Sequence, residues 1–205
     1  MSRSFIERWR TAGGSEQALP LLAESRQRFE AVEQRRPGCG AAGMTSVCFT
    51  AQGDCLLCLG RLDDAAAAYE EAIDRAEKHG HARQVAVGKG QLGTVRMLQR
   101  RYPEALAAFA AAREQFTQLD EPGSVAVIWH QTGMAYQNAG QPEAAAFYRQ
   151  AADRHVAIGD ASNEGRDRSN LAITLRQLGR LKEARQEIRR AIDCDAPFGH
   201  ASEHS

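Results

Sequence analysis

Four short segments decide the fold of this chain: Ala65-Ala66-Ala67-Ala68-Tyr69, Ala105-Leu106-Ala107-Ala108-Phe109, Ala144-Ala145-Ala146-Phe147-Tyr148 and Ala184-Arg185-Gln186-Glu187-Ile188. Their opening alanines are 40, 39 and 40 residues apart. Each opening alanine is followed by a large apolar residue four positions later and by another alanine seven positions later. Positions i, i+4 and i+7 lie on one face of a helix. The segments therefore predict four equivalent helices, each with a face that a neighbouring helix can approach closely.

A second column of residues lies upstream of these segments. It consists of Gly53, Gly93, Gly133 and Ala172, with spacings of 40, 40 and 39 residues. Because Gly133 lies one residue closer than the others to its downstream alanine, we expect the missing residue to fall in the turn, where a deletion costs a helical array least. No segment alternates with period two, so we see no strand. Each repeat is predicted to be a hairpin of two helices.

These columns resemble the tetratricopeptide repeat, whose signature includes Leu-Gly in the first helix and Ala-x3-Phe in the second. Leu92-Gly93 with Ala105 and Phe109 matches it best, whereas the fourth repeat has Ala172 at the glycine position. The period of about 40 exceeds the 34 residues usual for the family and is similar to the repeats of kinesin light chains, peptide-sensing bacterial regulators and the sensor arrays of signalling NTPases. The resemblance covers about residues 45–194. It implies an all-α fold, a right-handed α-solenoid of antiparallel helix hairpins.

The repeats also give the expected organisation of the chain. We predict a degenerate or truncated N-terminal hairpin at 1–36, a loop at 37–43, repeats at 44–81, 82–121, 122–160 and 161–195, and a flexible tail at 196–205. In the first segment we expect a helix at 4–12, a turn at 13–17 with Ser15 as N-cap, and Pro20 in the first turn of the next helix. Pro197 and its neighbours are expected to end the last helix. Since no polar capping helix follows, we expect either a piece of a longer protein or an open end that pairs with another copy.

The bulk composition argues against several classes of protein. The chain has 205 residues, and its 26 Lys and Arg balance 26 Asp and Glu. A balanced charge gives no long-range attraction to nucleic acid or an anionic membrane. No apolar run is long enough to span a bilayer, and the N-terminus lacks the apolar core of a signal peptide. We therefore expect a cytoplasmic protein with no nucleic-acid or membrane partner.

The cysteines are the sharpest chemical pattern. Cys55-x2-Cys58 follows Cys48 by seven residues, so all three can share one helix face. A zinc site needs further ligands at short spacing, and a redox pair belongs at a helix N-terminus after a strand. Neither condition is met, so we interpret the three as small apolar residues in helix packing. A metal-bound or redox domain stays the third hypothesis for the chain.

The remaining residues give no sign of catalysis. His130, His155 and His200 are isolated in sequence, and His79 and His81 flank a loop glycine. None has the neighbouring partner that a nucleophile and base require. No glycine-rich nucleotide-binding pattern occurs. We therefore predict no enzyme activity, no cofactor and no metal.

The family resemblance implies that the first helix of each repeat lines the concave face. Counted from the glycine column, positions −6, −3, +1 and +4 fall on one helical face. The predicted partner-binding groove consists of Val47, Thr50, Asp54, Leu57, Val87, Gly90, Thr94, Met97, Val127, His130, Met134, Gln137, Arg166, Ser169, Ile173 and Arg176. Alternatively, the apolar members of this set pack neighbouring helices, and the arginines of the last repeat form a solvated face with interleaved acids.

These observations predict a non-catalytic scaffold or sensor module. Its groove would bind a protein or peptide that combines apolar side chains with an acidic portion near Arg166 and Arg176. We expect it to be part of a larger bacterial signalling protein. The second hypothesis is a structural piece that assembles through its terminal hairpins.

Overall fold

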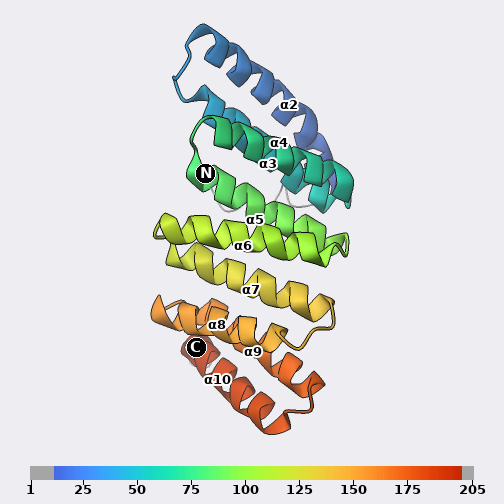
Figure 1. Ribbon diagram of the computed structural model, residues 1–205, viewed down its shortest axis with the longest axis vertical. Coiled ribbons are helices and arrows are strands. Elements are labelled where there is room, and N and C mark those ends of the chain that lie inside the picture. Colours follow the sequence, from blue (N-terminus) through green and yellow to red (C-terminus); the bar gives the residue numbers. More distant parts are fainter. Residues whose placement is uncertain (1–11, 200–205) are drawn as a thin grey trace, which may run out of the picture. The chain divides into compact units, whose positions relative to one another are not determined.

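A computed structural model describes residues 12–199, with side-chain environments for 14–194. Its helices are α2 (Ala12–Arg35), α3 (Ala41–Cys58), α4 (Leu62–Lys78), α5 (Ala82–Leu98), α6 (Tyr102–Gln118), α7 (Pro122–Asn138), α8 (Ala144–Ala157), α9 (Ala161–Gln177) and α10 (Leu181–Gly199) (Figure 1). No strand occurs within this range. The all-α fold predicted from the repeat columns is confirmed. The helix expected at 4–12 lies almost entirely outside the described residues, as does most of the expected tail.

The chain divides into two compact units, residues 1–115 and 116–205. In the first unit, α3 packs against α2 and α4, and α4 packs against α5. In the second unit, α8 packs against α7 and α9, and α9 packs against α10. Most of these contacts join helices that are consecutive in the chain, and α3 also contacts α5, which is the arrangement of stacked antiparallel hairpins.

The glycine column exists because an aromatic ring occupies the space of a side chain. A Cβ atom built on Gly53 would lie 2.6 Å from the Tyr69 ring, and one on Gly93 would lie 2.6 Å from the Phe109 ring. Gly133 has the same relation to Tyr148, at 2.9 Å. The two sequence columns are thus the two sides of one close contact between the helices of a hairpin.

The turns within and between hairpins share one backbone geometry. After α3, the Gly60 amide donates to the Leu57 carbonyl and the Arg61 amide donates to the Leu56 carbonyl. This is the Schellman arrangement, which requires a left-handed residue at its centre, and Gly60 has φ 71°. In the second repeat the same position is Arg100, with φ 61°.

The third repeat is shortened in its turn. Gly140 follows Gly133 by seven residues, as Gly60 follows Gly53, so the spacing is unchanged through the end of α7. The loss falls after Gly140, and α8 begins only at Ala144.

The ends of the described chain differ from the expected boundaries. The predicted turn at 13–17 is helical, and Ser15 is fully buried within α2 and is not an N-cap. Pro20 lies inside α2, well past its first turn. The predicted loop ends earlier because α3 begins at Ala41, and α10 continues past Pro197 to Gly199. Packing of α2 on α3 outweighs the turn preference of Gly13-Gly14.

Candidate functional site

In the first unit, the predicted groove residues lie on α3 and α5. Val47 and Asp54 are exposed, and four more are half-buried: Thr50, Leu57, Val87 and Thr94. Gly90 and Met97 are buried, and α5 packs against α4 and α3. The half of this face on α3 is therefore more accessible than the half on α5.

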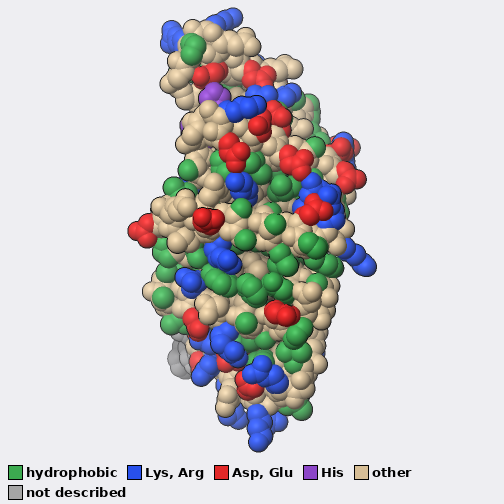
Figure 2. Space-filling view, viewed as in Figure 1, with side chains coloured by type: hydrophobic (Ala, Val, Ile, Leu, Met, Phe, Trp, Pro, Cys, Tyr) green, Lys and Arg blue, Asp and Glu red, His purple; other side chains and the backbone are tan. Residues whose placement is uncertain are grey.

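In the second unit, the predicted groove residues lie on α7 and α9. Val127, Arg166, Ile173 and Arg176 are exposed. Met134, Gln137 and Ser169 are half-buried, while His130 is buried, at 7% exposure. Lys and Arg side chains gather over the end of this unit that α9 and α10 form (Figure 2). Arg166 and Arg176 form no ion pair with the residues that the structure describes.

Buried tyrosines fix two of the groove side chains. The Tyr69 hydroxyl donates to the Asp54 Oδ1 atom at 2.6 Å, and the Gln91 amide donates to the same oxygen at 3.1 Å. Burial, and then the Asp54 carboxylate, raise the pKa of Tyr69 far above its ordinary value, so the phenol stays protonated. In the second unit, the Tyr148 hydroxyl donates to the Gln137 side-chain oxygen at 2.6 Å. The tyrosines that pack against the glycine column therefore also orient polar side chains on the first-helix face. Sequence spacing alone does not predict these hydrogen bonds.

Two histidines that are isolated in sequence meet at one buried carboxylate. The His130 Nδ1 and Asp167 Oδ1 atoms lie 2.5 Å apart, and the His155 Nδ1 and Asp167 Oδ2 atoms lie 2.6 Å apart. Asp167 is fully buried and His155 nearly so, at 1% exposure. Each histidine donates its Nδ1 hydrogen to the carboxylate, which accepts with both oxygens. The Tyr148 ring lies edge-on to His130, with centroids 5.5 Å apart. Sequence spacing does not reveal this cluster, because its members are 12 and 37 residues apart.

The cysteines do not form one site. Cys48 and Cys55 are buried, whereas Cys58 is exposed, and all are free thiols. Burial raises the pKa of both buried thiols, so they remain protonated and act as small apolar groups. No group of three potential metal ligands occurs within residues 12–199.

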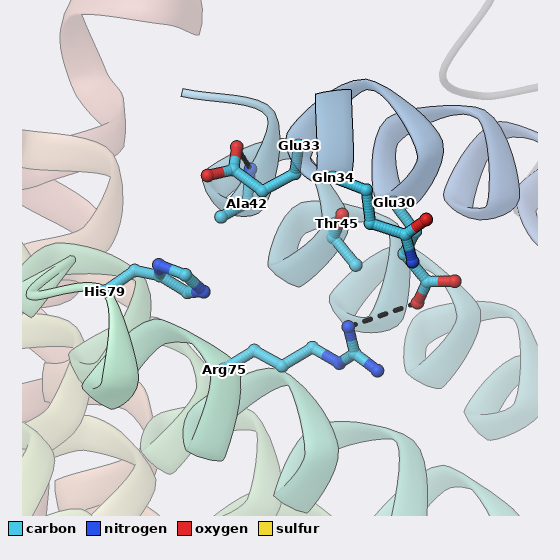
Figure 3. Close-up of a pocket in the computed structure, with 7 residues that line it drawn as sticks. All are labelled: Glu30, Glu33, Gln34, Ala42, Thr45, Arg75 and His79. Carbon is cyan, nitrogen blue, oxygen red and sulfur yellow. Dashed lines mark hydrogen bonds and ion pairs between the residues drawn. The ribbon is translucent and has the colours of Figure 1, made fainter. Parts of the chain in front are cut away.

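A polar cavity of about 410 Å³ lies among α2, α3 and α4 (Figure 3). Arg75 points into it and pairs with Glu30 at 3.1 Å, while it also contacts Glu71 and stacks on Phe49. Glu33 accepts hydrogen bonds from the backbone amides of Gly38 and Ala42, which lowers its pKa. The charged groups of this cavity are therefore engaged in holding α2 on α3 and α4. No sequence pattern predicts this cavity, because it depends on how α2 packs on α3 and α4.

Comparison with protein families identifies the repeats directly. One tetratricopeptide repeat model matches residues 84–154, and a second model of the same repeat matches residues 48–79 and 169–196. Together these matches cover more than half of the chain. The comparison with curated proteins found no match.

Solved structures agree with the family models in fold. BtubC (BKLC) from P. vanneervenii is 16% identical, over 94% of this chain and 95% of that one, with a TM-score of 0.72. A putative kinesin light chain from Podosopora anserina with nearly identical TPR-like repeats is 14% identical, over 97% and 95%, with a TM-score of 0.72. A STAND signal-transduction ATPase with a tetratricopeptide repeat sensor, from Pyrococcus horikoshii, is 16% identical over 90% of this chain and 30% of that chain, with a TM-score of 0.69. At these identities the likeness shows the fold alone.

The predicted resemblance to longer-period repeats of the kinesin light chain and signalling-sensor type is confirmed by these structures. Among the described helices, none is long and apolar enough to cross a membrane. The fold is that of a protein-interaction scaffold. The chain belongs to the tetratricopeptide repeat family.

Proposed function

We propose that this chain is a non-catalytic scaffold whose first-helix surfaces bind a peptide segment with apolar and acidic side chains. The observation that carries the proposal is the exposed face of α9, where Arg166 and Arg176 flank Ile173 and have no ion pair within the described structure. Hydrogen bonds from Asn163 chiefly lower the pKa of Asp160, and Arg166 adds a weaker attraction without forming an ion pair. Both guanidinium groups are therefore available for bidentate contact with a carboxylate from a partner.

The neighbouring helix supplies the apolar part of this surface. Val127 on α7 is 38% exposed and Ile173 on α9 is 40% exposed, with Met134 partly accessible. Apolar side chains beside a few oriented polar groups are typical of a peptide-binding surface. Gln137, held by the Tyr148 hydroxyl, is a polar group already fixed before a ligand arrives, which lowers the entropy cost of binding.

The α3 surface of the first unit is a second candidate contact region, and it carries an acidic side chain where the α9 surface carries arginines. Val47 is 44% exposed, and Asp54 is oriented by Tyr69 and Gln91. Because Asp54 carries a negative charge, this region suits a segment with a backbone amide or a cation. We infer that the scaffold needs no cofactor, acts in the cytoplasm, where its free thiols stay reduced, and is a sensor segment of a larger bacterial protein.

The test is selection of peptides from a random displayed library against the full chain. The enriched sequences should combine acidic and apolar residues, and they should bind an Arg166→Glu/Arg176→Glu variant at least about tenfold more weakly. The matched control is Arg35→Glu/Arg36→Glu, which reverses two exposed arginines at the C-terminal end of α2 and should leave binding unchanged. Enrichment of basic peptides, or equal losses in both variants, would refute the proposal.

A second candidate function is assembly of copies of this chain. It is favoured by the apolar side chains of α10, where Leu181 is 62% and Ile192 61% exposed. Light-scattering mass across a concentration series tests it: a mass that rises with concentration would support assembly, and a constant monomer mass would exclude it.

A further inference from the structure

Helix α10 has one face against the protein and an apolar stripe beside it. Ala184, Glu187 and Ala191 form the inner, buried face. The stripe consists of Leu181, Ile188 and Ile192, which are 62%, 43% and 61% exposed. Spacings of seven and four residues place these three on one narrow strip of the helix. The stripe is therefore a mainly apolar surface about three turns long, interrupted by Arg185.

The positions of Ile188 and Ile192 are covered in the third repeat, whereas Leu62, which corresponds to Leu181, is only half-buried in the first. Ile188 corresponds to Tyr69 in the first repeat and to Tyr148 in the third, and both are fully buried. Ile192 corresponds to Ala152 in the third repeat, also fully buried. What covers them is the first helix of the following hairpin, because α4 packs against α5 and α8 packs against α9. A helix is thus the element whose shape fits the stripe on α10.

The charges beside the stripe define the chemistry of that helix. In the first repeat, Glu70 lies at the position that follows Tyr69, and Arg96 of α5 pairs with it at 2.5 Å. In the third repeat the equivalent residue is Arg149, which approaches Glu183 of α10, at 3.8 Å. In both cases the next hairpin provides the opposite charge. The equivalent residue on α10 is Arg189.

Three cations of α10 have no such counterpart, whereas Arg190 pairs with Glu187 on the same helix. Arg189 and Arg185 are exposed, as is Lys182, and none of them forms an ion pair within residues 14–194. Arg185 lies within the stripe, between Leu181 and Ile188. A second copy of α10 placed on the stripe would bring the same cations against these. An acidic helix would instead pair with them, as α5 and α10 pair with the preceding hairpins.

We propose that the stripe of α10 binds an amphipathic helix with acidic flanks from a partner protein, in the position that α5 takes on α4 and α9 takes on α8. The apolar face of the partner covers Leu181, Ile188 and Ile192. Its carboxylates face Arg185 and Arg189. This surface is separate from the first-helix surfaces described under the proposed function.

The experiment uses two designed peptides and the full chain. The first peptide is a helix of about 18 residues, roughly five turns, with leucines on one face and glutamates beside them. The second carries lysine in place of each glutamate. Fluorescence anisotropy should show at least about tenfold tighter binding of the acidic peptide. Arg185→Glu/Arg189→Glu should invert this preference in favour of the lysine peptide, a gain that an unfolded variant cannot produce.

Two further variants locate the site. Ile192→Asp should abolish binding of both peptides, because it places a charge in the apolar contact. Arg166→Glu/Arg176→Glu should leave binding of the acidic helix unchanged, so failure of this proposal is distinguishable from failure of the groove. The proposal is overturned if the peptides bind equally or not at all. It is also overturned if Ile192→Asp converts a dimer into a monomer, since the occupant would then be a second copy.

Discussion

The junction of the α3–α4 hairpin with α5 and the junction of the α7–α8 hairpin with α9 use equivalent positions for opposite chemistry. In the first unit, the three positions are Thr50, Ala76 and Gly88. In the second unit they are His130, His155 and Asp167, the buried polar cluster. The first contact is close apolar packing: a Cβ atom on Gly88 would lie 2.7 Å from the Ile73 side chain.

The difference shows that this junction can be packed with either apolar or polar side chains, provided that all of the contacting residues change together. Asp167 replaces a glycine, and the isoleucine that fills the space beside Gly88 is replaced by Ala152. A buried carboxylate requires donors, and the two histidines supply them. One polar residue without the others would leave buried groups unpaired.

The largest expected effect comes from breaking the polar cluster. Asp167→Ala removes the acceptor for two buried histidines and should lower the free energy of unfolding by about 3–5 kcal/mol. Urea denaturation followed by circular dichroism measures it. Asp193→Ala, an exposed carboxylate on α10, is the control and should change the free energy by less than about 0.5 kcal/mol. A loss below about 1 kcal/mol for Asp167→Ala would show that the cluster adds little to stability.

The next effect comes from overfilling the contact that both units share. Gly93→Ala places a methyl group against the Phe109 ring and should cost about 1–3 kcal/mol. In the fourth repeat, Ala172 takes the place of the glycine, and Ile188 takes the place of the aromatic residue that packs against it. Gly93→Ala combined with Phe109→Ile should therefore recover part of the loss in the same denaturation assay. If Gly93→Ala alone does not change the free energy of unfolding, the Phe109 ring is not the reason for glycine at this position.

A smaller effect is expected when residues of the first unit replace those at the equivalent positions of the second unit. The replacement His130→Thr/His155→Ala/Asp167→Gly/Ala152→Ile removes the donors and the acceptor together and supplies an isoleucine. It should cost less than Asp167→Ala alone, about 2 kcal/mol or below, because no buried partner is left unpaired. A cost equal to or above that of the single variant would mean that the two contacts are not interchangeable.

The smallest effect concerns the turns. Arg100 has φ 61° where the first and third repeats have Gly60 and Gly140. Arg100→Gly should raise the free energy of unfolding by about 0.5–1 kcal/mol, because glycine adopts the left-handed conformation without steric cost. Gly60→Arg should lower it by a similar amount, and thermal denaturation compares the two. A loss of stability in Arg100→Gly would contradict this account of the turn.

The candidate site was only partly foreseeable. Periodicity placed Val127, Arg166, Ile173 and Arg176 on first-helix faces, and all four are exposed. The same counting also selected Met97 and His130, which are buried. Counting from one helix cannot distinguish these cases, because exposure depends on which neighbouring helix lies over each position.

The sequence by itself determined the hairpins of this protein. Ala65 and its equivalents, the glycine column and the turn residues act within one repeat, so their spacing is enough to predict helices, their order and the all-α class. Only the tertiary structure decided that Asp167 joins His130 to His155, that Tyr69 orients Asp54, and that Ser15 is buried inside a helix where a turn was predicted. Those contacts join residues on different helices. Their free energy depends on burial and on the geometry of the partners, which cannot be predicted from the spacing of residues along one helix.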